Sequence, residues 1–230
     1  MTFRGWHRVS YIEYPEKIST VLFVAGCNFR CPFCHNPELV TKDPLLPKIE
    51  EEEVLAYLAK RRGFLDAVCV TGGEPLLFAD ELLPFLQRVR ELGYLVKVDT
   101  NGSHHEAFHR LDALVDLWGI DFKLPFGRYY LVGGEKEEES VKAVLREVLI
   151  HPERAEIRTT IYPPFHNLEA LLAMSEELLP ARLWYWQNFE REKTLSPEAQ
   201  EVTPYSLPFL LSLKEAVNHR VGKNLVVIRS

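Results

Sequence analysis

Short apolar segments alternate with amphipathic helical segments along most of this 230-residue chain. The hydrophobic periodicity predicts strands at residues 19–25, 67–70, 94–98, 117–120, 156–161, 183–186 and 225–228. It predicts helices at residues 49–62, 80–92, 106–114, 137–149, 168–178 and 204–218. Strands that alternate with helices form parallel βαβ units with right-handed crossovers. About six such units are too few to close an eight-stranded barrel, so we expect an α/β fold with a partial (β/α)6 barrel of the TIM type.

The chain is expected to form a single domain, because 230 residues suit one α/β core. Its expected parts are an N-terminal edge strand or hairpin at 1–17, a partial barrel core at 18–190, and a C-terminal helix and strand at 191–230. The proline-containing segment 37–47 is expected to be a loop.

Composition and charge indicate which kinds of partner and which cellular compartment to expect. Hydrophobic residues make up 47% of the chain and charged residues 26%, which is typical of a soluble globular protein. The formal net charge of -6 argues against a nucleic-acid partner, because such proteins usually carry a basic face. Residues 1–11 lack the apolar core of an export signal. No apolar run approaches the roughly 20 residues of a membrane span. We therefore expect a cytoplasmic protein without a nucleic-acid or membrane partner.

Cysteines and polar residues follow the predicted strands, at the point where each strand ends. In a βα barrel the carboxyl ends of the strands form one face, and active sites are built on that face. We expect convergence there of Cys27, Cys31, Cys34, Gly72, Gly73, Glu74, Asp99, Thr100, Asn101, Asp121, Lys123, Thr160 and Gln187. Arg158, in the predicted strand 156–161, is a further candidate for this face.

Three of the four cysteines lie within eight residues, directly after the first core strand. They are Cys27, Cys31 and Cys34, and thiolates are the ligands preferred by iron-sulfur clusters and zinc. Three protein ligands leave one coordination position open, which is typical of sites that do chemistry. His35 could complete a Cys3His zinc site, although adjacent residues rarely face the same metal. Cys69 lies inside an apolar strand and is expected in the core.

The sequence Thr71-Gly72-Gly73-Glu74-Pro75 follows the second core strand. Consecutive glycines let a backbone approach a ligand closely, since no Cβ intervenes. An ordinary glycine-rich turn is the alternative. Pro75 is suited to the first turn of the next helix.

Two further acidic motifs end the third and fourth core strands. Asp99 could accept hydrogen bonds from ribose hydroxyls, with Lys97 nearby, whereas an Asx-type turn at Asn101 is the alternative. Asp121 and Lys123 lie two residues apart and therefore on the same side of an extended chain. A surface ion pair is the alternative for this D-x-K unit.

The C-x3-C-x2-C spacing, followed by the TGGEP segment, resembles the signature of radical S-adenosylmethionine (radical SAM) enzymes. The extension Cys34-His35-Asn36, within VLFVAGCNFRCPFCHNPELV, is similar to activating enzymes of glycyl-radical proteins, and especially to those of anaerobic ribonucleotide reductase. The resemblance runs from residue 20 to residue 123. It implies that the three cysteines hold a 4Fe-4S cluster whose fourth iron binds S-adenosylmethionine.

The same resemblance implies roles for other residues. Glycines and glutamate of the GGE motif contact the methionine amino group, and Lys123 meets the cofactor carboxylate. Phe33 lies beside the adenine. Asp121, with Asp99 and Thr100, could hold a monovalent cation. The residues expected to bind the cofactor are Phe33, Asn36, Gly72, Gly73, Glu74, Lys97, Asp99, Asn101, Asp121, Lys123, Thr160 and Gln187.

The implied activity is that of an oxidoreductase in which flavodoxin or ferredoxin reduces the cluster. S-adenosylmethionine is then cleaved to a 5'-deoxyadenosyl radical, which abstracts hydrogen from a glycine of a partner glycyl-radical enzyme. The protein positions the reactants and excludes water, and no side chain is expected to be catalytic. One alternative is a small-molecule radical SAM enzyme, such as a relative of 7-carboxy-7-deazaguanine synthase. A more remote alternative is a zinc-binding interaction protein that uses the three clustered cysteines and His35.

Overall fold

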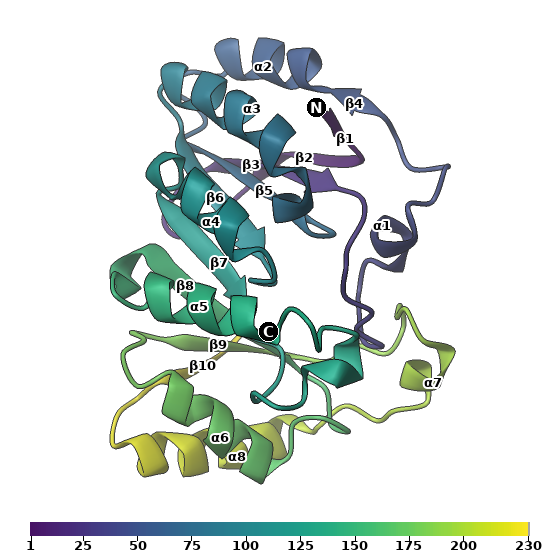
Figure 1. Ribbon diagram of the computed structural model, residues 1–230, viewed down its shortest axis with the longest axis vertical. Coiled ribbons are helices and arrows are strands. Elements are labelled where there is room, and N and C mark those ends of the chain that lie inside the picture. Colours follow the sequence, from purple (N-terminus) through teal and green to yellow (C-terminus); the bar gives the residue numbers. More distant parts are fainter. Residues whose placement is uncertain (230) are drawn as a thin grey trace. The chain divides into compact units, whose positions relative to one another are not determined.

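The computed structural model describes residues 1–229, and its chain divides into two compact units (Figure 1). The first unit comprises residues 1–28, 38–100 and 104–119. The second comprises residues 29–37, 101–103 and the chain from Ile120 onwards. The domain boundaries expected from the sequence stay a prediction.

The first unit is built on strands β2 (Gly5–Ser10), β3 (Ser19–Val24), β5 (Ala67–Gly72) and β6 (Leu95–Thr100). Strand β2 pairs antiparallel with β3, as expected of an N-terminal edge strand, and β3, β5 and β6 pair in parallel. The register pairs Val24 with Gly72, so β3 and β5 end at the same level. Strands β1 (Thr2–Phe3) and β4 (Ile49–Glu50) form a separate antiparallel pair. Strand β7 (Leu117–Asp121) carries the chain into the second unit.

The helices of the first unit bury one apolar face each, as their periodicity predicts. They are α2 (Glu51–Ala59), α3 (Ala79–Glu91) and α4 (His105–Leu111), with short 3-10 turns η1 (Pro75–Phe78) and η2 (Asp112–Leu114). Leu82, Phe85, Leu86 and Val89 of α3 are fully buried, at the spacing of one helical face. Gly93 follows α3 with a φ of +87°, the left-handed conformation that ends many helices.

The second unit contains parallel strands β8 (Ala155–Ile161), β9 (Trp184–Asn188) and β10 (Val226–Arg229). Its helices are α5 (Glu138–Val148), α6 (Leu168–Glu177), α7 (Pro197–Gln200) and α8 (Leu207–Val221), with 3-10 turns η3 (Tyr129–Val132) and η4 (Pro152–Arg154). Helices α6 and α8 lie side by side (Figure 1).

The two faces of β8 and β9 differ in burial. Ile157 and Thr159 of β8 share a buried face with Trp184 and Trp186 of β9, and both tryptophans are 0% exposed. The opposite face carries half-buried or exposed polar side chains, which are Arg158, Thr160, Tyr185 and Gln187. One side of these strands therefore belongs to the core, and the other is available for polar contacts.

Several sequence-based expectations were wrong in detail. Segment 37–47 contains a short helix, α1 (Pro37–Thr41), because proline is compatible with a first helical position. The last helix begins at Leu207 rather than 204, where the Ser206 hydroxyl accepts a hydrogen bond from the Phe209 amide. Gln187 lies inside β9 instead of following it. Likewise, the last residues of β5, β6 and β7 are Gly72, Asp99 with Thr100, and Asp121, which were expected to follow those strands.

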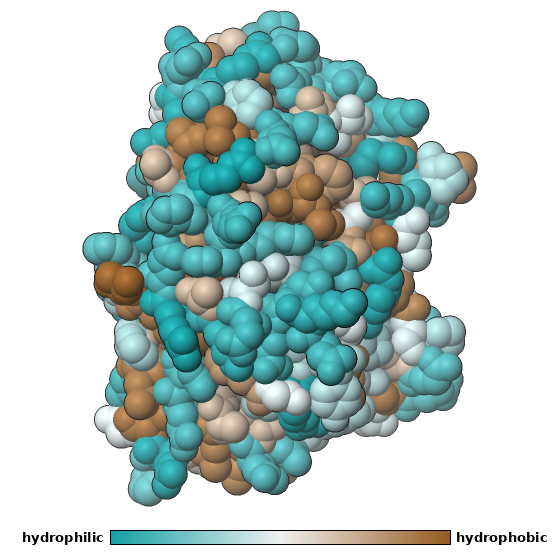
Figure 2. All heavy atoms as spheres, viewed as in Figure 1, coloured by the Kyte–Doolittle hydropathy of each residue, from teal (hydrophilic) through white to brown (hydrophobic). Residues whose placement is uncertain are grey.

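The face seen in Figure 2 is largely hydrophilic, with apolar side chains scattered among the polar ones. Within residues 1–229, none of the helices has the length and apolar character that crossing a membrane requires.

Candidate functional site

The cysteine loop begins where β3 ends. Gly26 has a φ of +112°, a conformation that favours glycine, and its amide donates a 2.7 Å hydrogen bond to the Leu39 carbonyl. Cys31 is buried, whereas Cys27 and Cys34 are half-buried, and all are thiols. The Cys34 amide donates to the Cys31 carbonyl at 3.1 Å, which makes a tight turn between two of the expected ligands.

The donor set of this loop fits an iron-sulfur cluster. Three thiols separated by three and two residues lie within chain reach of one inorganic centre, and thiolates are its natural ligands. Among residues 1–229, no three His, Cys, Asp or Glu side chains are already gathered in metal-binding range. The assignment of Cys27, Cys31 and Cys34 as cluster ligands therefore rests on their chemistry and spacing, and it stays a prediction.

Gly72 and Gly73 pack directly against the start of the cysteine loop. A Cβ on Gly73 would lie 2.1 Å from the Gly26 carbonyl oxygen, and one on Gly72 would lie 2.4 Å from the Val24 carbonyl oxygen. The Gly73 amide donates to Val24 at 2.9 Å, and the Glu74 amide donates to Gly26 at 2.8 Å. The two glycines are thus required by the approach of two backbones, in addition to any contact with a cofactor.

Glu74 is a fully buried carboxylate at the end of β5. Its Oε1 atom accepts hydrogen bonds from the Thr100 hydroxyl at 2.7 Å and from the Leu76 amide at 3.0 Å. The second bond caps the 3-10 turn η1. Two motifs that the sequence analysis treated separately, GGE and the end of β6, are therefore joined by a hydrogen bond.

Lys97 is almost completely buried on β6. Its Nζ atom donates to the Glu13 carbonyl at 2.6 Å and lies 3.6 Å from Asp99 Oδ1. Gly119 leaves room for this pair, since a Cβ there would lie 2.1 Å from Asp99 Oδ1. The expected cofactor contacts of Lys97 and Asp99 stay predictions, and the observed contacts of Lys97 include the N-terminal segment and Asp99.

Asn101 forms the turn that was weighed as the alternative to a cofactor contact. Its Oδ1 atom accepts from the Ser103 amide at 2.9 Å, two residues further on. Asp99 and Thr100 lie in the first unit and Asp121 in the second, so the monovalent-cation site also stays a prediction.

In the second unit, Asp121 is held by two cations. Lys123 Nζ lies 3.3 Å from Asp121 Oδ2, and Arg158 donates to Oδ1 from Nε at 3.1 Å and from Nη2 at 2.9 Å. Burial alone would raise the pKa of Asp121, but the two cations outweigh it and hold that pKa below its usual value.

Phe33 of the cysteine loop packs into an aromatic cluster. Its ring centroid lies 5.2 Å from that of Tyr162, 6.0 Å from Phe165 and 6.5 Å from His166. Among the other expected cofactor contacts, Asn36 and Thr160 are half-buried and Gln187 is exposed.

His166 is a site residue that the sequence analysis missed. It is 0% exposed, its Nε2 lies 2.8 Å from the Lys123 carbonyl, and its Nδ1 accepts from the Tyr162 amide at 2.9 Å. Burial lowers the pKa of His166 to about 4, so the ring is neutral near pH 7. It joins the D-x-K segment to the loop after β8, and nothing in the sequence around it signals this role.

Cys69, the fourth cysteine of the chain, and His35, weighed as a zinc ligand, lie in different environments, buried and half-buried respectively. Cys69 is 1% exposed in the middle of β5, and burial raises its pKa to about 12, which disfavours the thiolate that binds metals. Its expected place in the core is confirmed. Burial also lowers the pKa of His35, against the opposing effect of Glu190 and Glu192.

Comparison with known proteins identifies the family. The model of the "Radical SAM superfamily" matches residues 21–146. The chain is 30% identical over 202 residues to the "Putative glycyl-radical enzyme activating enzyme" of Methanocaldococcus jannaschii, covering 84% of this chain and 82% of that protein. It is 29% identical over 175 residues to the 7-carboxy-7-deazaguanine synthase of Methanospirillum hungatei, covering 70% and 71%.

A solved structure supports the fold. Streptococcus suis SuiB superposes with a TM-score of 0.66 at 16% sequence identity, over 91% of this chain and 48% of SuiB. Its S-adenosylmethionine-bound form gives a TM-score of 0.65. The expected α/β fold of the partial-barrel kind is confirmed. The chain belongs to the radical SAM superfamily, whose members use a 4Fe-4S cluster and S-adenosylmethionine.

Proposed function

We propose that this protein is a glycyl-radical-enzyme activating enzyme, an oxidoreductase whose substrate is a glycine of a partner protein. The observation that carries the proposal is the similarity to an activating enzyme over 84% of the chain. The Cys34-His35-Asn36 extension and the D-x-K unit support it. Anaerobic ribonucleotide reductase is the proposed partner, on the resemblance of the cysteine loop, and the proposed compartment is the cytoplasm.

Residues of the expected motifs would hold the cofactors. Cys27, Cys31 and Cys34 would ligate the cluster, and the half-buried backbone of Gly72 and Gly73 would receive the methionine amino group. Lys123, beside Asp121, would bind the cofactor carboxylate as a point charge. When bound, the cluster and S-adenosylmethionine supply the one-electron chemistry that removes hydrogen from the substrate.

The aromatic cluster supports a role for Phe33 in shaping the cofactor site. A ring held by Tyr162 and Phe165 has little freedom to turn, which suits a surface against which an adenine packs. His166 fixes the Lys123 carbonyl from the same side, so the D-x-K unit and the cysteine loop share one support.

A second candidate function is a small-molecule radical SAM reaction. The similarity to a 7-carboxy-7-deazaguanine synthase over 70% of the chain favours it. Such an enzyme would take a purine-like substrate in place of a protein.

Electron paramagnetic resonance of anaerobically reconstituted, dithionite-reduced protein tests the shared chemistry. We expect a 4Fe-4S signal that changes when S-adenosylmethionine is added and is lost in Cys31→Ala. Cys69→Ala is the matched control, because that thiol lies in the core. A zinc-containing sample without a signal, or a signal indifferent to S-adenosylmethionine, would contradict the proposal.

The partner is tested separately. Incubation of the reduced protein and S-adenosylmethionine with anaerobic ribonucleotide reductase should produce a glycyl radical and one 5'-deoxyadenosine for each radical formed. Turnover of a purine-like substrate, without a protein radical, would favour the deazaguanine-type function instead.

A further inference from the structure

A cavity of about 390 Å³ opens in the first unit beside the start of the cysteine loop. Its walls include Val24 and Ala25, which directly precede Gly26. Consecutive Cα atoms are about 3.8 Å apart, so Ala25 lies within about 7 Å of Cys27 along the chain. A molecule bound in this cavity would therefore lie close to the start of the cysteine loop, which belongs to the same unit as the cavity.

Lys42 lies on Gly26 from the side of this cavity. Its Cε atom is 2.6 Å and its Nζ 3.3 Å from the position that a Cβ on Gly26 would occupy. The lysine has a φ of +57°, a left-handed conformation that is uncommon for residues other than glycine, asparagine and aspartate. The backbone at the end of α1 is thus turned so that the lysine stem covers the loop residue next to Cys27.

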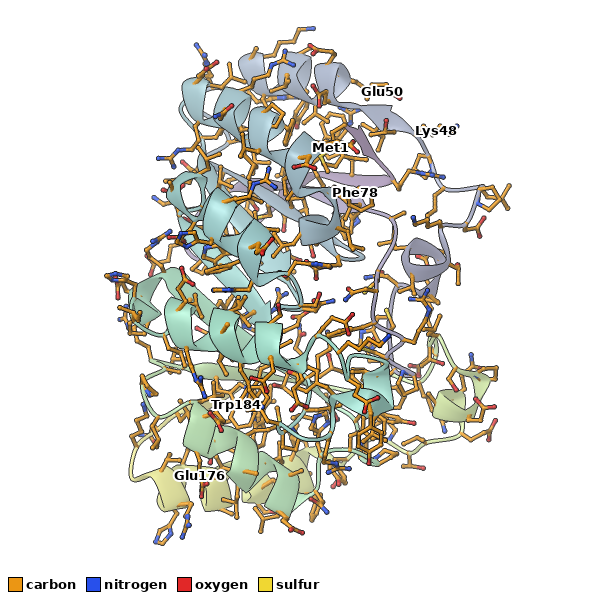
Figure 3. All side chains as sticks on the ribbon, in the orientation of Figure 1. Met1, Lys48, Glu50, Phe78, Glu176 and Trp184 are labelled. Atoms are coloured by element: carbon orange, nitrogen blue, oxygen red, sulfur yellow. The ribbon has the colours of Figure 1, made fainter. Side chains whose placement is uncertain are left out.

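The cavity carries more positive than negative groups in a chain whose net charge is -6. Its positive groups are Lys42, Lys48 and Arg4, and its carboxylates are Glu50 and Glu81. The amine of Met1 adds no net charge, because it forms a 2.6 Å ion pair with Glu51. Figure 3 labels Met1, Lys48, Glu50 and Phe78 of this lining.

The cations differ in how far they are already engaged. The Arg4 guanidinium donates hydrogen bonds to three backbone carbonyls, those of Asp43, Leu46 and Pro47. These bonds hold the loop at residues 43–47 in place, but they do not neutralise the charge of Arg4. Lys42 and Lys48 are exposed, and neither forms an ion pair within residues 1–229. The ammonium groups of these two lysines, in the cavity beside the start of the cysteine loop, are therefore available to pair with the carboxylates of a bound protein.

We propose that this cavity is the docking surface for a small acidic one-electron carrier protein, whose carboxylates meet Lys42 and Lys48. The proposal rests on the proposed function, because it supplies the electron that the cluster needs. The carrier loses one electron and the cluster gains one, and no bond or proton changes. Charge complementarity selects this occupant, since steering by opposite charges raises association rates by about 10 to 10³-fold.

Stopped-flow reduction of the reconstituted full-length protein tests the proposal, with fully reduced flavodoxin as the probe and cluster bleaching as the signal. The test variant combines Lys42→Asn and Lys48→Gln, which together change the net charge by the same amount as Lys60→Glu, and asparagine tolerates the left-handed backbone at residue 42. Lys60→Glu is the matched control, because Lys60 is an exposed lysine of the same unit outside the cavity. Photoreduced 5-deazaflavin serves as a donor without protein charges.

We expect the double variant to accept electrons from flavodoxin about tenfold more slowly at low ionic strength, with the difference shrinking as salt is added. Lys60→Glu should match the wild type, and deazaflavin should reduce all three proteins equally.

Equal flavodoxin rates for the double variant and Lys60→Glu would overturn the docking surface. An equal loss of rate with deazaflavin would overturn it too, because the loop itself would then be damaged. Inhibition by inorganic phosphate at constant ionic strength would assign the cavity to small anions instead. A wild-type cluster that deazaflavin cannot reduce would refute the proposed function itself, and this inference with it.

Discussion

Replacement of Gly73 by alanine tests the contact on which the cysteine loop depends. The added Cβ would lie 2.1 Å from the oxygen, 2.7 Å from the carbon and 3.0 Å from the nitrogen of Gly26. All three atoms belong to a backbone that is hydrogen-bonded to Leu39 and Glu74 and cannot rotate away as a side chain would. Overpacking of this kind costs about 1–3 kcal/mol and occasionally more, so we expect a loss of about 3 kcal/mol in the free energy of unfolding.

Two other glycines separate the clash from backbone conformation. Gly93 has a φ of +87° and no neighbouring atom within 4 Å of an added Cβ. Its left-handed conformation costs an alanine about 1–2 kcal/mol, offset by roughly 0.4–1 kcal/mol from the stiffer unfolded chain, so Gly93→Ala should cost about 1 kcal/mol. Gly72 combines a φ of +120° with a 2.4 Å clash, and Gly72→Ala should cost about 4 kcal/mol.

Urea unfolding of the metal-free chain, followed by circular dichroism, measures these costs, and iron bound per chain after reconstitution measures the effect on the cluster. We expect Gly73→Ala to lose both stability and iron, and Gly93→Ala to keep its iron. If Gly73→Ala unfolded at the wild-type midpoint and bound as much iron, or if Gly93→Ala cost as much as Gly73→Ala, the close approach of Gly73 to Gly26 would be wrong.

Three further predictions follow from the buried polar contacts. Thr100→Val removes the hydroxyl that donates to Glu74 and should cost about 1–3 kcal/mol in urea unfolding while weakening S-adenosylmethionine binding in calorimetry. The folded-state pKa of His166, about 4, lies below its unfolded value of 6.5. Its contribution to the free energy of unfolding is therefore complete above pH 6.5, and about 3 kcal/mol is lost as the pH falls to 4. His166→Phe should flatten this dependence of stability on pH, and an unchanged dependence would contradict the buried neutral ring. The pKa of Asp121 is depressed below 3.8, so its contribution to stability is present above pH 3.8 and is lost as the pH falls through the folded pKa. Because the side chain is 36% exposed, Asp121→Asn should change the free energy of unfolding at acid pH by less than about 1 kcal/mol, as measured by urea unfolding.

The order of strands and helices was predictable because apolar periodicity is local. The buried face of α3 and the parallel pairing of β3, β5 and β6 are where the pattern predicts them. Helix α1 was missed because Pro37 and Pro44 within one short segment favour a loop. Strand β9 extends two residues beyond its apolar run because Gln187 and Asn188 pair with β8, and that pairing depends on a distant segment.

Site contacts were less predictable where they join segments far apart in the chain. Arg158 reaches Asp121 across 37 residues, and His166 reaches the Lys123 carbonyl across 43. A single sequence has no signal for either pairing. The partner of Lys97 illustrates the same limit, because the Glu13 carbonyl comes from 84 residues earlier.

The glycine pair after β5 shows how a motif and its scaffold can require the same residues. Gly72 and Gly73 would be needed for backbone approach even if no cofactor bound, because Val24 and Gly26 already occupy the space that side chains would take. The hydrogen bonds from the Gly73 amide to Val24 and from the Glu74 amide to Gly26 then fix the position of the backbone directly before Cys27. A substitution at either glycine would therefore displace the cysteine loop as well as alter the proposed cofactor contact. Loss of activity in such a variant identifies neither role, whereas the unfolding free energy of the metal-free chain reports the scaffold role alone.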